Sequence, residues 1–309
     1  MSANATGTTT STALHRFAVF TAGCTFLLVL AGALVTSNDA GLAVPDWPLS
    51  YGSLMPPMVG GIFYEHGHRL VATSVGLLTI VLAVWLALRE PRRWVRRLGW
   101  LALGAVVLQG LLGGLTVLFL LPRPVSIAHA SLAQVFFCLT VALAVFTSRS
   151  WQAETSPVED TGSPSLRQLS TAATGAIFLQ LVLGAAYRHS AIGILPHLAG
   201  AALVAYLGLS VFRRTRNLPA AAGALNRPAR LLVWLVLAQL GLGVAAYLAR
   251  LAAANAPQPL PLMVALTVGH VAAGALILAT SAVLTLQAHK HLRGRGEVVS
   301  LPSVERAAV

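Results

Sequence analysis

Four histidines lie within or at the edge of long apolar stretches of the chain. They recur in register, two in each half, and are His68, His129, His197 and His270. An ionisable side chain inside a membrane span is costly, so such a residue is by default a candidate for function. Because all four are expected at a similar depth, we interpret them as two pairs of imidazole ligands from neighbouring helices. Taken singly, each histidine is equally well explained as an interfacial residue that snorkels or forms a hydrogen bond.

Two imidazoles per site favour haem over zinc as the bound group. Zinc sites more commonly include Cys or carboxylate ligands, with several ligands close together. Haem in a helical bundle needs one imidazole on each face of the macrocycle. It also needs small residues where the flat ring lies against a helix, and the residues four positions after the histidines are Ala72, Ala133, Ala201 and Gly274. This coincidence carries little weight in a chain so rich in Ala and Gly.

One carboxylate accompanies the first histidine. Glu65 precedes His68 by three residues, so both lie on one helix face if the helix begins there. A carboxylate beside a haem edge can take or give protons, or stabilise a developing cation. Two other interpretations stay open, namely a helix N-terminal carboxylate favoured by the macrodipole and a salt bridge to Arg69.

The elements that must position these residues follow from composition. The chain has 309 residues, of which 56% are hydrophobic and 10% charged, and its mean hydropathy is +0.76. Soluble domains carry about 25% charged residues, so a soluble or disordered chain is excluded. Eight stretches are long enough to span a bilayer, at about 17–36, 68–88, 98–121, 127–147, 169–187, 191–212, 231–250 and 262–286.

The formal net charge of +12 is explained by the predicted orientation of the spans in the membrane. If the N-terminus is cytoplasmic, 17 of the 21 Lys and Arg residues fall in cytoplasmic segments. We therefore predict a multi-pass protein of the cell (plasma) membrane with both termini cytoplasmic. The basic residues are divided among several loops without an accompanying motif, which excludes a nucleic-acid partner. Four arginines break the trend and lie on the outer side, at Arg69, Arg123, Arg188 and Arg250.

These outer arginines suggest how haem would be oriented. Haem propionates are anionic, and arginine is the preferred partner of carboxylates. We expect some of these arginines to hold propionates, with Arg69, Arg188 and Arg250 as the candidates. The haem sites are then expected towards the outer side of the membrane, where the four histidines are also predicted.

An internal repeat divides the chain. The pattern Gln-x-x-x-Gly begins at Gln109, Gln180 and Gln239, and a histidine follows each copy in the next span. Glycine-rich faces are also a general packing device in membranes. Each half has four spans, so the halves are predicted to be parallel repeats related by an axis along the membrane normal. The fold class expected is all-α, with eight transmembrane helices in two four-helix bundles. Its predicted parts are residues 1–147, a cytoplasmic linker 148–168, residues 169–288 and a cytoplasmic tail 289–309.

Two local stretches resemble a known family. Residues Tyr64–Arg69 (YEHGHR) resemble the glutamate-x-x-histidine-arginine signature of haem A synthase, and Gly41–Gly52 resembles that family's first outer loop. The eight-span layout and one histidine per even-numbered helix also match, so the resemblance covers about 15–290. One departure is the absence of the cysteine pair that many members carry in the first outer loop. The two cysteines here, Cys24 and Cys138, lie in apolar spans.

The resemblance implies a reaction and its residues. Haem A synthase oxidises the C8 methyl group of haem O to a formyl group by two hydroxylations, which gives haem A for terminal oxidases. By analogy, His68 and His129 would flank the substrate in the N-terminal half, and Glu65 would lie near the reacting methyl group. His197 and His270 would hold a haem b in the C-terminal half. The expected partners are haem O synthase (a farnesyltransferase) and the oxidase assembly route, and a homo-oligomer stays open.

Two other classes of protein compete with this interpretation. A b-type dihaem cytochrome that exchanges electrons with quinone fits the composition and the histidines equally well. Glu65 and the long first outer loop favour the synthase, because a pure electron carrier needs no carboxylate there. A transporter with parallel repeats predicts charged midplane residues, and the sequence offers none.

Overall fold

The computed structural model describes residues 11–252, 256 and 259–294. Within them, eight helices are long and apolar enough to cross a membrane, which confirms the predicted all-helical class with eight spans. These helices are α1 (Thr12–Ser37), α2 (Gly60–Arg89), α3 (Arg93–Leu118), α4 (Arg123–Thr147), α6 (Leu166–Arg188), α7 (Leu195–Arg216), α8 (Asn226–Ala252) and α9 (Pro261–His291). The short elements are α5 (Arg149–Gln152), β1 (Val158–Asp160), η1 (Ala220–Leu225) and β2 (Leu292–Gly294).

The helices start where the local sequence supplies a cap or a proline. The Ser11 hydroxyl accepts a hydrogen bond from the Leu14 backbone at the start of α1, and Ser165 forms a capping box with Gln168 at the start of α6. Proline occupies the first turn of α4, α7 and α9, where its missing N–H costs nothing. These five long helices therefore begin at a local signal, whereas α2 and α3 begin without a side-chain cap or a proline in the first turn.

Helix α2 departs most from the predicted spans. It begins at Gly60, eight residues before the apolar stretch predicted over 68–88. The charged and polar residues of 65–69 interrupt the hydropathy, but they do not interrupt the backbone hydrogen bonds of the helix. His68 is the first residue of the predicted span 68–88, but it lies in the third turn of α2, so its predicted place at the start of the helix is wrong.

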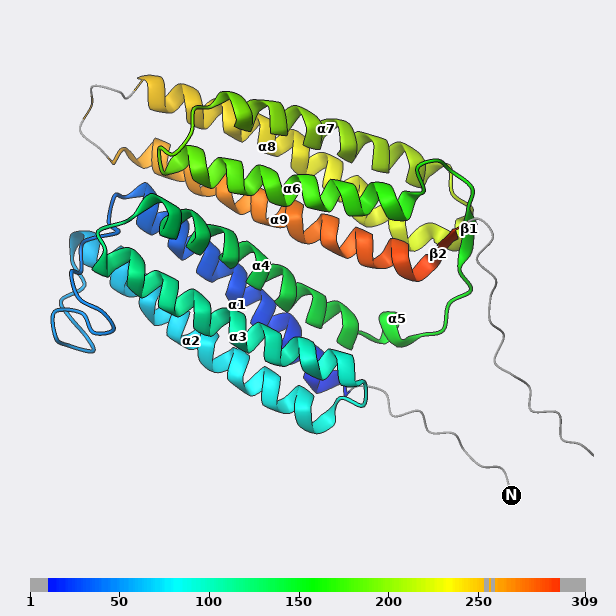
Figure 1. Ribbon diagram of the computed structural model, residues 1–309, viewed down its shortest axis with the longest axis horizontal. Helices are drawn as coiled ribbons and strands as arrows, with labels where there is room; N and C mark the ends of the chain where they lie inside the picture. The colour runs from blue at the N-terminus through cyan, green and yellow to red at the C-terminus, as the bar shows by residue number, and fades with distance from the viewer. Residues whose placement is uncertain (1–10, 253–255, 257–258, 295–309) are drawn as a thin grey trace, which may run out of the picture.

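The helices form two groups that lie side by side (Figure 1). In the first group α1 contacts α2 and α4, and α3 contacts the same two helices. In the second group α6 contacts α7 and α9, and α8 contacts the same two helices. The groups meet where α1 and α4 pack on α9 and where α4 packs on α6. Helices α2 and α4 thus occupy opposite corners of the first group, and α7 and α9 those of the second. This arrangement is compatible with the predicted parallel repeats, and the repeat relationship stays a prediction.

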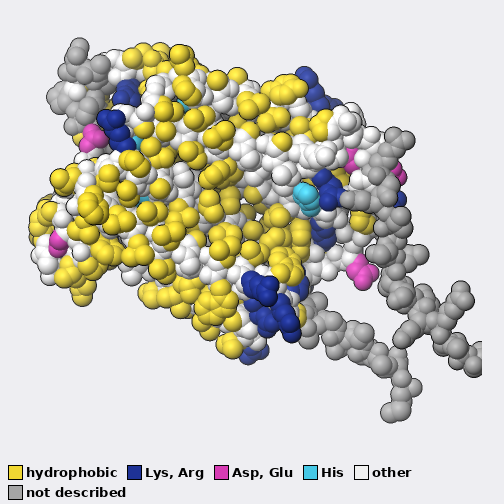
Figure 2. Space-filling view, in the orientation of Figure 1, with side chains coloured by type: hydrophobic (Ala, Val, Ile, Leu, Met, Phe, Trp, Pro, Cys, Tyr) yellow, Lys and Arg dark blue, Asp and Glu magenta, His cyan; other side chains and the backbone are white. Residues whose placement is uncertain are grey.

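The two ends of the helices differ in chemistry. We call the end where α1 begins the terminal end, and the end that carries residues 38–59 the loop end. Residues 38–59 are called the first loop. Figure 2 shows hydrophobic side chains over most of one face, with Lys and Arg gathered mainly near the terminal end. This distribution agrees with a multi-pass membrane protein, because the apolar band faces lipid and the charges lie beyond it.

The segment that joins the two groups has structure of its own. Strand β1 pairs in parallel with β2, with Val158 opposite Leu292. The buried Asp160 carboxylate accepts hydrogen bonds from Arg214 Nη2 at 3.1 Å and from the backbone N–H of Leu166. The predicted linker 148–168 and the start of the predicted tail are therefore joined to each other and to α7.

Candidate functional site

Each of the four span histidines packs against a glycine of the preceding long helix. A Cβ atom added at the glycine would lie 2.9–3.2 Å from the imidazole Cε1 in every case. The pairs are Gly32 with His68, Gly113 with His129, Gly184 with His197 and Gly243 with His270. Any larger residue would push the imidazole away, so the glycines set where the histidine rings lie.

Three of these helical hairpins add a glutamine four residues before the glycine. Gln109 Nε2 donates to the backbone carbonyl of His129 at 2.9 Å and lies 3.5 Å from its ring Nε2. Gln180 Nε2 donates to the carbonyl of His197 at 2.9 Å and lies 3.0 Å from its Nδ1. The repeated Gln-x-x-x-Gly pattern is thus a histidine cradle, in which glycine admits the ring and glutamine contacts it.

The histidine cradle on α8 has the glutamine, whereas the one on α1 lacks it. Gln239 Nε2 lies 3.2 Å from His270 Nε2, as the repeat predicts. In α1 the residue four positions before Gly32 is Leu28, so His68 has the glycine but no glutamine. The Gln-x-x-x-Gly pattern does not mark this first cradle, because its glutamine is absent.

The histidines come together in pairs from opposite corners of each group. The imidazole centroids of His197 and His270 lie 6.3 Å apart with planes inclined at 69°. Metal–nitrogen bonds of about 2 Å would place the centroids of two axial imidazoles about 6 Å apart, so this separation fits one iron atom between them. His68 on α2 and His129 on α4 belong to the two helices at opposite corners of the first group, and each ring packs on its glycine.

The donor set fits haem in other respects too. The Nδ1 atoms of His68, His129 and His270 are buried and have no hydrogen-bond partner among the described residues. No group of three or more His, Cys, Asp or Glu converges anywhere in the described residues. Pairs of imidazoles with small residues beside them are what bis-histidine haem requires, whereas zinc usually needs more ligands.

Glu65 is buried at the base of the first loop. Its Oε2 accepts a hydrogen bond from the backbone N–H of Val44 at 2.8 Å, and its Oε1 accepts one from Arg69 Nη2 at 2.7 Å. The salt bridge that the sequence left open is therefore present, and the carboxylate also fastens the loop. Its neighbour His66, to which sequence reasoning gave no role, is buried and shares a 2.8 Å hydrogen bond with the Ser50 hydroxyl.

The guanidinium of Arg69 is occupied by the first loop. Its Nη1 donates to the carbonyls of Asp46 and Leu49 at 2.8 and 2.7 Å, besides the ion pair to Glu65. The indole of Trp47 packs so closely on Gly114 that a Cβ there would lie 2.6 Å from it. The loop is thus held against both α2 and α3, beside the carboxylate.

Arg188 and Arg250 lie near the loop end of the second group. Arg188 Nη2 donates to the carbonyl of Thr36 on α1 at 2.6 Å, which connects the two groups. Arg250 lies 5.7 Å above the ring of Tyr187, and that ring stacks on His197 at 6.4 Å. The structure therefore brings Arg250 towards the second histidine pair through Tyr187, an aromatic residue that sequence reasoning did not select.

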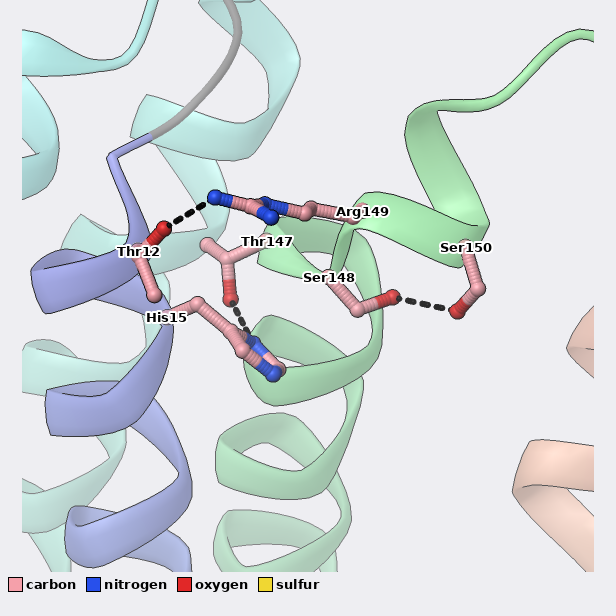
Figure 3. A pocket seen from close by; sticks show the side chains of 6 residues that line it. All are labelled: Thr12, His15, Thr147, Ser148, Arg149 and Ser150. Atoms are coloured by element: carbon pink, nitrogen blue, oxygen red, sulfur yellow. Dashed lines mark hydrogen bonds between the residues drawn. The ribbon is translucent and has the colours of Figure 1, made fainter.

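A cavity at the terminal end is separate from the histidines. It has a volume of about 310 Å³ and lies between the start of α1 and the end of α4 (Figure 3). Arg149 Nη2 donates to the Thr12 hydroxyl there at 2.8 Å, and His15 Nδ1 lies 3.3 Å from the Thr147 hydroxyl. Because the histidine pairs lie towards the other end of the helices, this cavity is not part of the candidate site.

Comparison with known proteins gives one consistent name. The chain is 34% identical over 168 residues to the Heme A synthase of Symbiobacterium thermophilum, which covers 53% of this chain and 55% of that protein. It is 32% identical over 129 residues to the Heme A synthase of Listeria monocytogenes, covering 41% and 42%. It is 30% identical over 137 residues to that of Alkalihalophilus pseudofirmus, covering 43% and 46%. The matches span about half the length of these curated relatives.

A family model extends the likeness beyond these partial matches. The model of the cytochrome oxidase assembly proteins (COX15-CtaA) matches residues 15–288, a range that holds all eight long helices apart from a few terminal residues. All four cradled histidines and Glu65 fall inside it. The chain therefore belongs to the family of cytochrome oxidase assembly proteins.

Proposed function

We propose that this protein is a haem A synthase, which oxidises the C8 methyl group of haem O to a formyl group in the membrane. The observation that carries the proposal is the buried carboxylate of Glu65, three residues before a cradled histidine on α2. Relatives named Heme A synthase support it. No feature of the described part of the chain singles out the alternative, a dihaem cytochrome that serves quinone, and that alternative gives Glu65 no role.

The four histidines are proposed to hold two haems. His68 and His129 would hold the substrate, haem O, between α2 and α4. His197 and His270 would hold a haem b, which supplies one-electron chemistry when it is bound. The glycine cradles and the 6.3 Å spacing of the second pair support these roles.

Glu65 is proposed to hold and move the proton released at the reacting methyl group. Its two oxygens face Arg69 and the backbone of Val44, so the carboxylate is held in one orientation before the substrate arrives. Arg69 is engaged by the loop, which favours a positioning role over the predicted propionate contact. Arg188 and Arg250 are then the proposed propionate partners, because both lie near the loop end.

The orientation in the cell follows from the charges. With the basic terminal end cytoplasmic, both termini face the cytoplasm of a cell membrane and the loop end with its haem sites faces outward. Haem O synthase is the proposed supplier of substrate, and the terminal oxidase is the proposed destination of the product.

Coexpression with a haem O synthase tests the reaction. Membranes that contain both proteins should accumulate haem A or its hydroxylated intermediate, separated by chromatography of extracted haems. Folded, haem-loaded protein that yields only haem O would overturn the proposal.

Substitution of Glu65 tests the chemistry within the site. Glu65→Gln should reduce conversion about 100-fold or more, because positioned acid–base groups contribute about 10²–10⁴, while haem O stays bound. The exposed Glu154 offers a matched control, and Glu154→Gln should convert haem O at the wild-type rate. Equal conversion by the two variants would remove Glu65 from the mechanism.

A further inference from the structure

A second cavity at the terminal end lies in the other helix group, between the end of α7 and the start of α8. Its volume is about 520 Å³, within the range of roughly 300–1,000 Å³ typical of small-molecule sites. The described residues that line it are Phe212, Arg216, Asn226 and Arg230. Arg216 lies over the ring of Phe212, with its Cζ atom 5.8 Å from the ring centroid. Two guanidinium groups from two helices therefore border one cavity.

These two arginines have no anionic partner within the part of the chain that the structure describes. Neither the Arg216 nor the Arg230 guanidinium forms an ion pair or a hydrogen bond there. The sequence has no Asp or Glu from position 161 to position 296. The carboxylate that precedes this stretch, Asp160, is engaged by Arg214 at 3.1 Å. The positive charge at the cavity is therefore available to a bound anion.

Exposed apolar side chains lead away from the cavity along both helices. Leu209 stands three residues before Phe212 on α7, and Trp234 and Leu237 stand four and seven residues after Arg230 on α8. Residues at these spacings share one face of a helix. Helices α7 and α8 lie on the side of the second group away from the first (Figure 1), so these exposed faces meet lipid in the membrane.

One class of molecule matches both the cations and the apolar faces. A phospholipid joins an anionic phosphate to apolar acyl chains, and arginine binds phosphate oxygens through paired N–H groups. Basic pockets between transmembrane helices at the cytoplasmic side bind such headgroups. A tryptophan one turn inside the arginines, as Trp234 is, also suits the level of the headgroups. Free phosphate would satisfy the arginines but would make no use of the apolar faces.

We propose that the cavity between α7 and α8 binds the phosphate group of an anionic phospholipid, with Arg216 and Arg230 as its ligands and the acyl chains along the exposed faces. The site lies at the other end of the helices from the histidine pairs, so the inference goes beyond the proposed function and does not depend on it. Arg213 and Arg227 are exposed on the same two helices but do not line the cavity. They carry the charge that orients the spans without contributing to the site.

Native mass spectrometry of the purified full chain, titrated with phosphatidylglycerol, tests the site. An arginine near an anionic lipid contributes about fivefold in affinity, so Arg216→Gln and Arg230→Gln should each weaken lipid binding about fivefold. Arg213→Gln and Arg227→Gln remove the same charge from the same helices and should bind as the wild type does. Equal weakening in the two pairs of variants would overturn the proposal, because net charge alone would then explain the binding.

Two further ligands identify the source of the phosphate. Phosphatidylcholine, whose phosphate is neutralised by its own choline group, should bind at least about fivefold more weakly than phosphatidylglycerol. Inorganic phosphate at the same concentration should not displace the bound lipid, because it has no acyl chains. Equal binding of the two lipids would overturn the role of the arginines, and displacement by inorganic phosphate would overturn the assignment to lipid.

Folding of the variants is checked independently of the lipid. All four substituted side chains are exposed, so the variants should keep the helical circular dichroism of the wild type. Lipid extracted together with the protein from cell membranes provides a second measurement, and the ratio of anionic lipid to protein should fall in Arg216→Gln and Arg230→Gln only. A ratio unchanged in these two variants would overturn the proposal.

Discussion

At the scale of single residues, the candidate site depends on four glycines, which have no side chain, as much as on the four histidines. Four glycines leave room for four imidazoles, because a Cβ atom at any of these positions would lie only 2.9–3.2 Å from the imidazole Cε1 and would force the ring to shift. A bis-histidine site tolerates little displacement, because both rings must meet one iron atom. The glycine positions are therefore expected to control haem binding as directly as the histidines.

A glycine pair on α8 tests this control. Gly243→Ala places a methyl group 2.9 Å from His270 Cε1, and should lower the affinity for the proposed haem b roughly tenfold. Gly241 lies two residues earlier in α8, and none of the described residues comes within 4 Å of a Cβ placed there, so Gly241→Ala should retain the proposed haem b fully. The measurement is the ratio of extracted haem b to purified protein, and equal ratios would contradict the cradle.

The first loop contains a carboxylate whose charge matters. The backbone N–H groups of Gly52 and Tyr51 donate to Asp46 at 2.8 and 2.7 Å, and with Arg69 nearby they hold the pKa of Asp46 below its usual 3.8. A lowered pKa means that this carboxylate stabilises the folded loop above pH 3.8, and that the stabilisation is lost as the pH falls through the folded value. Cleavage of the loop by an acid protease should therefore accelerate below pH 3.8, and Asp46→Asn should flatten that pH dependence. A wild-type cleavage rate that follows only the protease's own pH profile would argue against it.

At the scale of elements, the extension of α2 and the first loop create one unit. Residues 60–67 continue the helix beyond the apolar stretch, and the loop folds back so that Val44, Asp46 and Leu49 reach Arg69 or Glu65. This packing needs no cysteine pair, since Trp47 rests on α3 and Ser50 bonds to His66.

A second glycine pair tests the packing of the first loop on α3. Gly114→Ala would bring a Cβ to 2.6 Å from the Trp47 indole, whereas Gly110 has nothing within 4 Å. Overpacking of this kind costs about 1–3 kcal/mol. Proteolysis of the loop in detergent should therefore speed up about tenfold in Gly114→Ala, and haem O conversion should fall because Glu65 loses the Val44 contact. Gly110→Ala should match the wild type, and equal proteolysis of both variants would show that the loop does not depend on this seat.

At the scale of the whole molecule, the two helix groups are joined at both ends. At the loop end Arg188 reaches Thr36, and at the terminal end β1 pairs with β2 while Asp160 binds Arg214. Between them α1 and α4 pack on α9, so the interface runs along the length of the helices (Figure 1). The two histidine pairs are therefore held in a constant relation.

Asp160 is the residue whose substitution should weaken this connection most. Removing one member of a fully buried ion pair typically costs about 3–5 kcal/mol, and the cost should be smaller here because the Arg214 side chain is 31% exposed. Asp160→Asn also weakens the bond to the Leu166 N–H. Thermal unfolding of the purified protein should occur at a clearly lower temperature. Its neighbour Glu159 is exposed, and Glu159→Gln should leave the midpoint unchanged. Identical midpoints in the two variants would show that the joint contributes little.

The sequence by itself determined the number of spans and the register of three cradles. Apolar length is a local sum, and Gln-x-x-x-Gly followed by histidine is a local pattern, so both can be read without knowing what packs where. It also placed Glu65 and His68 on one helix face, since three-residue spacing is a property of the helix alone. The helix start at Gly60 was missed because hydropathy responds to side chains and not to backbone hydrogen bonds.

Only the tertiary structure decided what these residues touch. Arg69 meets loop carbonyls from positions 20 and 23 residues before it. Arg188 meets Thr36 across the two groups, and Tyr187 stacks on His197. Leu28 can be recognised as standing where three other helices have glutamine only once Gly32 is known to pack on His68. Such contacts join residues that are distant in the chain, and their energies depend on how whole helices pack. No local pattern contains that information, so the partners of each charged side chain had to come from the fold.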